Sequence, residues 1–196
     1  MIKQIYITNG AGTSGKDSFS KMLNKYISTY KYSIVELSKQ AAKVLGWDGT
    51  SKTAKDRRFL SDIMDLATEY NDSPFRDVVS IIADFKNNLI EDEILIIDMR
   101  DPKDITRTVK MFEAKTILIR NPRVEKIETN HADANVENYD YDYIIENNGT
   151  LEQLDATTRE FVEFIISEEE SLPLCAYCTF GGGKRTVVFQ CNKMLR

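Results

Sequence analysis

No cysteine precedes Cys175 in this 196-residue chain, and the three that occur, Cys175, Cys178 and Cys191, lie near the C-terminus. The main body therefore has no disulfide framework. The chain also lacks an uninterrupted apolar run of the roughly 18 residues that a membrane span needs. Its N-terminal apolar stretch is too short for a signal peptide. We therefore expect a cytoplasmic protein without a membrane partner.

Positive charge is not in excess. Acidic residues outnumber basic ones by 31 to 26, which gives a net charge of -5. Proteins that coat duplex nucleic acid neutralise its phosphates with Lys and Arg, so this balance argues against such a partner. With 42% hydrophobic and 29% charged residues, the composition is that of an ordinary globular protein. The length suits one domain with a small appendage.

Short runs rich in Ile and Val alternate with longer segments of helical period. This alternation indicates an α/β fold with a parallel sheet. The run 94–97 is apolar on both faces, as a central buried strand should be. The expected strands are 3–8, 32–37, 93–98, 115–120 and 141–146.

Apolar residues at helical spacing predict helices between these strands. One stripe runs from Phe19 to Tyr30 and another from Phe59 to Tyr70. Ser73-Pro74 and Asp101-Pro102 each place a capping residue before a proline and predict helix starts. A capping box at Thr150 to Gln153 predicts a last helix, with these side chains facing inward: Leu151, Leu154, Phe161 and Ile165.

Residues 10–16, Gly-Ala-Gly-Thr-Ser-Gly-Lys, follow the first expected strand and lead directly into a helix. They match the pattern G-x-x-x-x-G-K of a phosphate-binding loop in its required context. Glycines let backbone N–H groups surround a phosphate, and the helix N-terminus adds positive potential. Lys16 would reach the β- and γ-phosphates. The residues assigned to nucleotide binding are Gly10, Gly12, Thr13, Ser14, Gly15 and Lys16.

Asp17 stands where such loops usually carry a Ser or Thr whose hydroxyl binds Mg²⁺, and Ser18 follows it. Two interpretations remain open: Asp17 meets the ion, directly or through water, or it has another role, such as a base near the acceptor. Asp98 ends the third expected strand, where open α/β sheets bind ligands, and is suited to orient Mg²⁺ and its water, unless it is a simple strand-end cap. Arg100 can grip a phosphate or carboxylate, unless it is a solvated strand-end charge.

A polar segment begins at Arg120 and Arg123 and runs to residue 140. Long polar segments inside compact domains are often lids, and lid arginines stabilise the charge of a transferring phosphoryl group. A solvated loop with incidental charges is the alternative. His131, the single histidine, lies here and is expected to be a surface group rather than a catalyst.

Together these residues resemble the P-loop nucleoside monophosphate kinases, in particular the deoxynucleoside monophosphate kinases of phages. The Ser-Gly-Lys-Asp form at 14–17 is typical of that branch and also occurs in animal-type phosphomevalonate kinases. Asp98-Met99-Arg100 resembles its strand-end Asp-x-Arg element, and 141–149 resembles its last strand and base-side loop. Segments 46–49 and 56–60 resemble the acceptor-binding region of small relatives. The resemblance covers about residues 1 to 167.

The resemblance implies a three-layer P-loop NTPase fold over residues 1–170, with a five-stranded parallel sheet in the order 2-3-1-4-5. It also implies a helical acceptor-binding insert at 38–90, a lid-like loop at 121–139 and ATP with Mg²⁺ as cofactors. The reaction would be transfer of the γ-phosphoryl group to a (deoxy)nucleoside monophosphate.

The resemblance also implies roles for individual residues. Asp17, Ser18 and Asp98 would lie around Mg²⁺, and Asn147 and Gly149 near the adenine. The acceptor phosphate would meet Lys43, Arg57, Arg58 and Arg100, although Arg57 and Arg58 suit a charged helix face equally well. Trp47 would stack on an acceptor base or fill core. The residues that would act in the transfer are Lys16, Asp17, Arg100, Arg120 and Arg123.

Residues 171–196 have no counterpart in that family. Their cysteines are one ligand short of a structural zinc site, which His131 would complete only through a tertiary contact. A β-hairpin turning at 181–183, an added edge strand and a disordered tail are the other interpretations. Two other functions also remain open: a kinase acting on a hydroxymethylated base in DNA or another small phosphorylated acceptor, and a non-kinase ATP-binding switch. We expect a small-molecule acceptor, and a homodimer is left open.

Overall fold

The computed structural model describes residues 2–51, 53–124, 136, 139–171 and 186–191. The chain divides into two compact units, each considered by itself. The sheet unit comprises Met1–Lys31 and Ile90–Arg196, and the helical unit comprises Tyr32–Leu89. The expectations for Cys175, Cys178, the turn at 181–183 and His131 lie outside the described residues.

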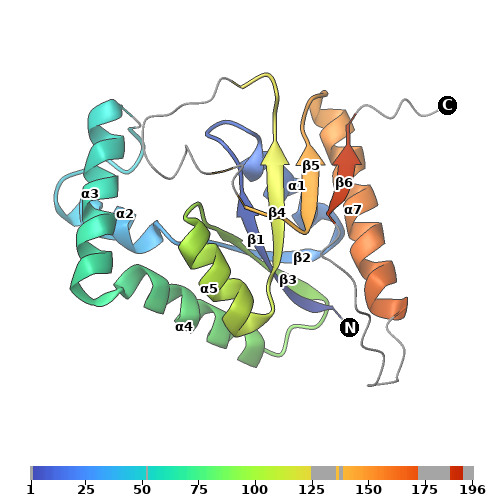
Figure 1. The fold of residues 1–196 in the computed structure, drawn as a ribbon, viewed down its shortest axis with the longest axis horizontal. Coiled ribbons are helices and arrows are strands. Elements are labelled where there is room, and N and C mark those ends of the chain that lie inside the picture. Colours follow the sequence, from blue (N-terminus) through green and yellow to red (C-terminus); the bar gives the residue numbers. More distant parts are fainter. Residues whose placement is uncertain (1, 52, 125–135, 137–138, 172–185, 192–196) are drawn as a thin grey trace. The chain divides into compact units, whose positions relative to one another are not determined.

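A six-stranded sheet forms the centre of the sheet unit, in the order β2-β3-β1-β4-β5-β6. The pairs β1–β3, β1–β4, β4–β5 and β5–β6 are all parallel. The α/β class and the order 2-3-1-4-5 are therefore confirmed, with one strand added beyond β5 (Figure 1). The strands are β1 (Lys3–Asn9), β2 (Ser28–Ser33), β3 (Glu93–Asp98), β4 (Lys115–Arg120), β5 (Tyr143–Glu146) and β6 (Val187–Gln190).

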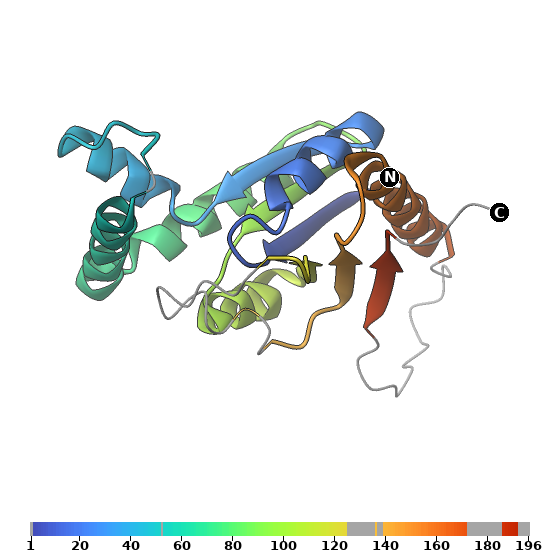
Figure 2. The same cartoon turned by 90° about the horizontal axis from the view of Figure 1, so that it is seen from above.

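Helices cover both faces of this sheet. Helices α1 (Lys16–Tyr26) and α7 (Leu151–Ser171) lie on one face, and α5 (Pro102–Phe112) lies on the other (Figure 2). Phe19 and Phe161 meet with ring centroids 5.8 Å apart in the core between α1, α7 and the strands. Burying these large side chains is the main favourable term for this layer.

The predicted helix starts follow from side-chain caps. The Asp101 side chain accepts a hydrogen bond from the Lys103 N–H at 2.7 Å. At the start of α7, Thr150 and Gln153 form the reciprocal bonds of a capping box, at 2.8 and 3.3 Å. Both predictions are confirmed, although Leu151, expected to face inward, is exposed.

Two boundaries near β2 were predicted wrongly. Helix α1 ends at Tyr26 rather than continuing to Tyr30, because Ile27 already has an extended backbone. The second strand is then Ser28–Ser33 instead of 32–37, and Glu36 begins a helix. Ile27 is buried in the extended chain, as it would be in a helix, so the apolar stripe does not mark where the helix stops.

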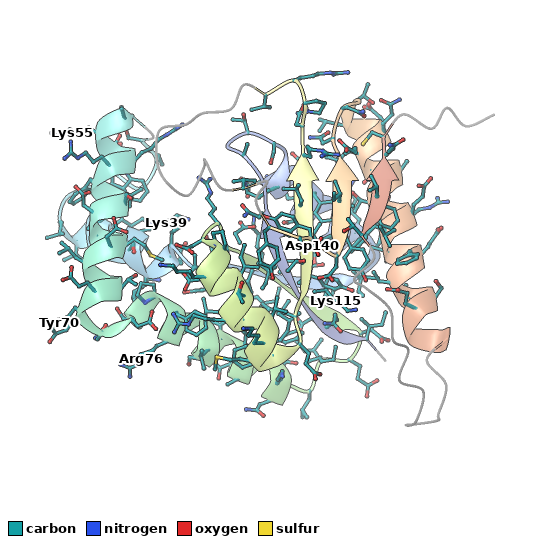
Figure 3. All side chains as sticks on the ribbon, in the orientation of Figure 1. Lys39, Lys55, Tyr70, Arg76, Lys115 and Asp140 are labelled. Atoms are coloured by element: carbon teal, nitrogen blue, oxygen red, sulfur yellow. The ribbon has the colours of Figure 1, made fainter. Side chains whose placement is uncertain are left out.

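The helical unit contains α2 (Glu36–Val44), α3 (Ala54–Asn71) and α4 (Ser73–Asn87). A capping box between Thr53 and Asp56 starts α3, which has no buried residue. Its exposed Lys55 and Tyr70 project from the helix (Figure 3). Asp72, with φ 57°, separates α3 from α4, so the N-cap of α4 is Asp72 rather than the expected Ser73.

Within the described part of the chain, no helix has the length and apolarity to cross a membrane.

Candidate functional site

The loop between β1 and α1 has the backbone that an anion cradle needs. Positive φ angles occur at Gly10 (152°), Thr13 (63°) and Gly15 (102°), and Gly15 is the N-cap of α1. Gly15 has no side chain to accept hydrogen bonds from the first N–H groups of α1. These N–H groups therefore remain available to bind an anion. The Ser14 N–H closes the loop by donating to the Ala11 carbonyl at 3.2 Å.

The first and third glycines of this loop also leave no room for a side chain. A Cβ atom on Gly10 would lie 2.5 Å from the Ile119 carbonyl oxygen, and one on Gly15 would lie 2.3 Å from Asn147 Nδ2. The loop is thus pressed between the ends of neighbouring strands. Ser14 is buried, and its Oγ has no hydrogen-bond partner among the described residues.

Lys16 folds back over the loop that precedes it. Its Nζ donates to the carbonyl oxygens of Gly10 at 2.5 Å and Ala11 at 3.1 Å. The ammonium group is therefore held at the mouth of the cradle formed by the loop. The Thr13 hydroxyl is exposed and donates to the Gly12 carbonyl at 2.6 Å.

Asp17 and Asp98 converge on a residue that the sequence analysis did not select. Lys31 Nζ lies 2.5 Å from Asp17 Oδ1 and 3.1 Å from Asp98 Oδ2. Asp98 also accepts a hydrogen bond from Thr8 Oγ1 at 2.5 Å. In the sequence, Lys31 is a single lysine between Tyr30 and Tyr32. Because the second strand was expected to begin only at residue 32, Lys31 was not recognised as a strand residue.

A buried hydrogen-bond chain begins at the loop's first N–H. The Gly10 N–H donates to Asn9 Oδ1 at 2.8 Å, and Asn9 Nδ2 donates to the Tyr141 hydroxyl at 2.8 Å. The Tyr141 hydroxyl in turn donates to the Val136 carbonyl at 2.7 Å. Burial raises the pKa of Tyr141, which the bond from Asn9 only partly offsets, so the hydroxyl stays protonated and remains a donor.

Asn147 and Gly149, expected near the adenine, lie directly after β5. Asn147 Nδ2 donates to the Ser14 carbonyl at 2.8 Å, which ties this segment to the phosphate-binding loop. Gly149 lies against the side chains of Gln153 and Cys191. The Cys191 thiol is buried and free, and accepts from Thr157 Oγ1 at 3.5 Å.

The arginines expected to act in the transfer differ in their surroundings. Arg120 forms an ion pair with the buried Glu146, through its Nε at 2.9 Å and through a second guanidinium nitrogen. Arg123 is exposed, and its backbone N–H donates to Asn121 Oδ1 at 3.0 Å. Arg100 is half-buried just after β3, and Ser18 is half-buried in the first turn of α1.

The remaining candidates belong to the helical unit. Lys43 is exposed on α2 with its side chain against Gly49, and Arg57 is exposed on α3. Arg58 lies 3.8 Å from Asp62 one turn later, an exposed pair that contributes little to stability. Trp47 is half-buried, and its Nε1 donates to the Ser51 carbonyl at 3.2 Å.

Carboxylate oxygens from Asp17 and Asp98 are the ligands that Mg²⁺ prefers. Both face one cation, the Lys31 ammonium, so their placement fits a cation between them. Among the described residues, no group of three or more His, Cys, Asp or Glu side chains is arranged to hold a metal ion. Any Mg²⁺ bound here would therefore need water or phosphate oxygens to complete its coordination.

No protein-family model and no curated protein matches this sequence. Solved structures with a similar course of the chain include three kinases. Shikimate kinase from Aquifex aeolicus is 11% identical with a TM-score of 0.44, and the match covers 86% of this chain and 99% of the kinase. Thymidylate kinase from Candida albicans is 12% identical with a TM-score of 0.49, and the match covers 85% of this chain and 92% of the kinase. A sugar kinase from Janibacter sp. is 9% identical with a TM-score of 0.49, and the match covers 83% of this chain and 95% of the kinase.

Proposed function

We propose that this protein is an ATP-dependent kinase that transfers the γ-phosphoryl group of ATP to a (deoxy)nucleoside monophosphate. One observation carries the proposal. The glycine loop leads into the open N-terminus of α1, while Asp17 in its first turn and Asp98 at the end of β3 face the same cation. Phosphoryl transfer needs positioning and charge neutralisation of this kind more than covalent chemistry.

In this proposal the loop binds the donor. The backbone N–H groups of Gly12, Thr13 and Gly15 surround the phosphates, and the N-terminus of α1 adds positive potential. Gly10 and Ser14 shape the loop, because their N–H groups are bonded to Asn9 and Ala11. Lys16 turns its ammonium from the carbonyls of Gly10 and Ala11 to the β- and γ-phosphates. Asn147 keeps the loop in this conformation through its bond to Ser14.

Asp17, Asp98 and the neighbouring Ser18 are the residues that would hold Mg²⁺. When bound, the ion would neutralise charge on the phosphate oxygens and orient them for in-line attack. Thr8 fixes one oxygen of Asp98 by donating a hydrogen bond to it, so that this carboxylate is already oriented.

Basic side chains would bind the acceptor phosphate. Arg100, just after Asp98, is the candidate from the sheet unit, while Lys43, Arg57 and Arg58 are the candidates from the helical unit. Guanidinium groups bind phosphate oxygens in a bidentate manner, which favours a phosphorylated acceptor. Arg120 and Arg123 would stabilise the charge of the transferring group, with Arg120 oriented by Glu146.

An ADP-release assay with ATP, Mg²⁺ and a panel of ribo- and deoxynucleoside monophosphates tests the proposal. Turnover should depend on one acceptor or a few and fall at least ~100-fold in Lys16→Ala, because the lysine contacts the transferring group. Lys21→Ala, at an exposed position on the same helix, is the matched control and should keep the rate.

Two outcomes would contradict the proposal. Phosphorylation only of an oligonucleotide with a hydroxymethylated base would point to the DNA-directed kinase. ATP hydrolysis or binding that is indifferent to every acceptor would point to the switch.

A further inference from the structure

Three elements of the sheet unit place their charged side chains at one point. Lys31 comes from β2, Asp17 from the first turn of α1 and Asp98 from the end of β3. The Lys31 ammonium contacts both carboxylates, at 2.5 and 3.1 Å, whereas Lys16 is bonded to loop carbonyls. Lys31 is therefore a second lysine at the site, outside the G-x-x-x-x-G-K pattern.

The surroundings of Lys31 keep it charged. Its amine lies within ion-pair distance of both carboxylates, and nearby negative charges favour the protonated form of a lysine. The exposed fractions of the side chains are 29% for Lys31, 19% for Asp98 and 83% for Asp17. Ion pairing at the partly buried Asp98 is screened less by solvent than pairing on the open surface.

We infer that Lys31 is the resident cation of the Asp17–Asp98 carboxylate pair and competes with a divalent metal ion for it. The inference rests on the proposed function, which assigns these two carboxylates to Mg²⁺. A divalent ion between them would lie within a few ångströms of the ammonium, and two cations so close repel each other strongly. The pair alone therefore has a low affinity for metal.

Nucleotide phosphates change this balance. Their negative charges attract both cations, so the metal can take the carboxylates while Lys31 turns to a phosphate oxygen as a point-charge ligand. Lys31 thus makes the metal enter together with the nucleotide rather than before it. Lys31 therefore weakens metal binding when nucleotide is absent, and it contacts a phosphate when nucleotide is bound.

Direct metal binding tests the inference without relying on turnover. Mn²⁺, which prefers oxygen ligands as Mg²⁺ does, is titrated into the full chain without nucleotide, and free Mn²⁺ is measured by electron paramagnetic resonance. Lys31→Met should bind Mn²⁺ at least about tenfold more tightly than the wild type, because the competing charge is gone. Lys25→Met is the matched control, since Lys25 pairs with Asp155 at 2.8 Å, and should leave the affinity unchanged.

Two further variants localise the effect. Lys31→Arg keeps the cation and should retain the weak binding of the wild type. Adding Asp98→Asn to Lys31→Met should remove the gain, because it removes a ligand of the same pair. Circular dichroism and the urea midpoint establish that each variant is folded, and Lys31→Gln replaces Lys31→Met if that variant is not.

Unchanged or weaker Mn²⁺ binding by the folded neutral Lys31 variant would overturn the inference, as would a gain in affinity that survives Asp98→Asn. Failure of the proposed kinase function is a separate result, because it is read from acceptor-dependent ADP release. Tighter metal binding in Lys31→Met with no acceptor-dependent turnover in the wild type would keep the role of Lys31 and reject the kinase.

Discussion

Asn147 Nδ2 donates a hydrogen bond of 2.8 Å to the carbonyl oxygen of Ser14, a residue 133 positions earlier in the chain. The same nitrogen lies where a Cβ atom on Gly15 would have to fit. The segment after β5 therefore holds the phosphate-binding loop from one side. Its backbone is fixed in turn, because the Asn147 N–H donates to the Arg120 carbonyl at 2.7 Å.

Replacing Asn147 by Ala should weaken ATP binding by about fivefold, since one hydrogen bond is worth about 1 kcal/mol and the loop loses its lateral support. Isothermal titration calorimetry measures the change. Asn24→Ala is the control, because Asn24 accepts a comparable bond from Thr29 N–H at 3.1 Å at the other end of α1. Equal losses of ATP affinity in the two variants would argue that Asn147 acts only through general stability.

Gly10→Ala should abolish measurable ATP binding. The new Cβ would meet the Ile119 carbonyl at 2.5 Å, and that backbone atom cannot move without disturbing β4. Gly46→Ala separates the effect of this clash from the cost of a positive φ angle. Gly46 has φ 99°, but no atom of the residues that the structure describes lies within 4 Å of its Cβ position. We expect Gly46→Ala to cost about 1 kcal/mol of unfolding free energy and to bind ATP normally. Normal ATP binding by Gly10→Ala would refute the steric argument.

Tyr141→Phe should change how stability depends on alkaline pH. Burial raises the pKa of Tyr141 in the folded state above the unfolded value of about 10. The unfolded state therefore ionises first, and this contribution to the unfolding free energy is lost as the pH rises above about 10. Urea unfolding between pH 8 and 11 should show a shallower decline in Tyr141→Phe than in the wild type.

At neutral pH, Tyr141→Phe should also be less stable by about 1–3 kcal/mol, because Asn9 Nδ2 and the Val136 carbonyl lose their buried partner. Tyr30→Phe, at an exposed position on β2, serves as the control for both measurements. If the unfolding free energies of Tyr141→Phe and the wild type fall equally between pH 8 and 11, the pKa of Tyr141 is not raised in the folded state.

Phe189→Ala tests whether the C-terminal strand β6 is part of the fold. The centroid of the Phe189 ring lies 5.5 Å from that of Phe161 and 5.6 Å from that of Phe164, and the ring packs against the main core. We expect a loss of about 2 kcal/mol in the urea-derived unfolding free energy, less than for a fully buried Phe. Val188→Ala, on the exposed face of the same strand, should change it by less than about 0.5 kcal/mol. An unchanged midpoint for Phe189→Ala would mean that the packing of β6 contributes nothing to the stability of the fold.

The sequence predicted those features that depend on neighbouring residues. Pro102 after Asp101, the Thr150–Gln153 capping box and the apolar runs at 93–98 and 115–120 each encode their own local structure, and each was found as expected. The strand expected at 141–146 is shorter, Tyr143–Glu146, and the one expected at 32–37 is displaced to Ser28–Ser33. The glycine loop is also local, because the positive φ angles at Gly10 and Gly15 favour residues without a Cβ at these two positions. The end of α1 was misjudged because the buried Ile27 satisfies the helical and the extended pattern equally.

The contacts that complete the candidate site were decided only by the tertiary structure. Lys31 meets Asp17 and Asp98, and Asn147 meets Ser14, because the order of the strands in the sheet brings together segments that are far apart in the chain. The parallel addition of β6 beside β5 is of the same kind. Strand order and register arise from the packing of the whole core, so hydrophobic periodicity within one segment does not specify which residues meet at that edge.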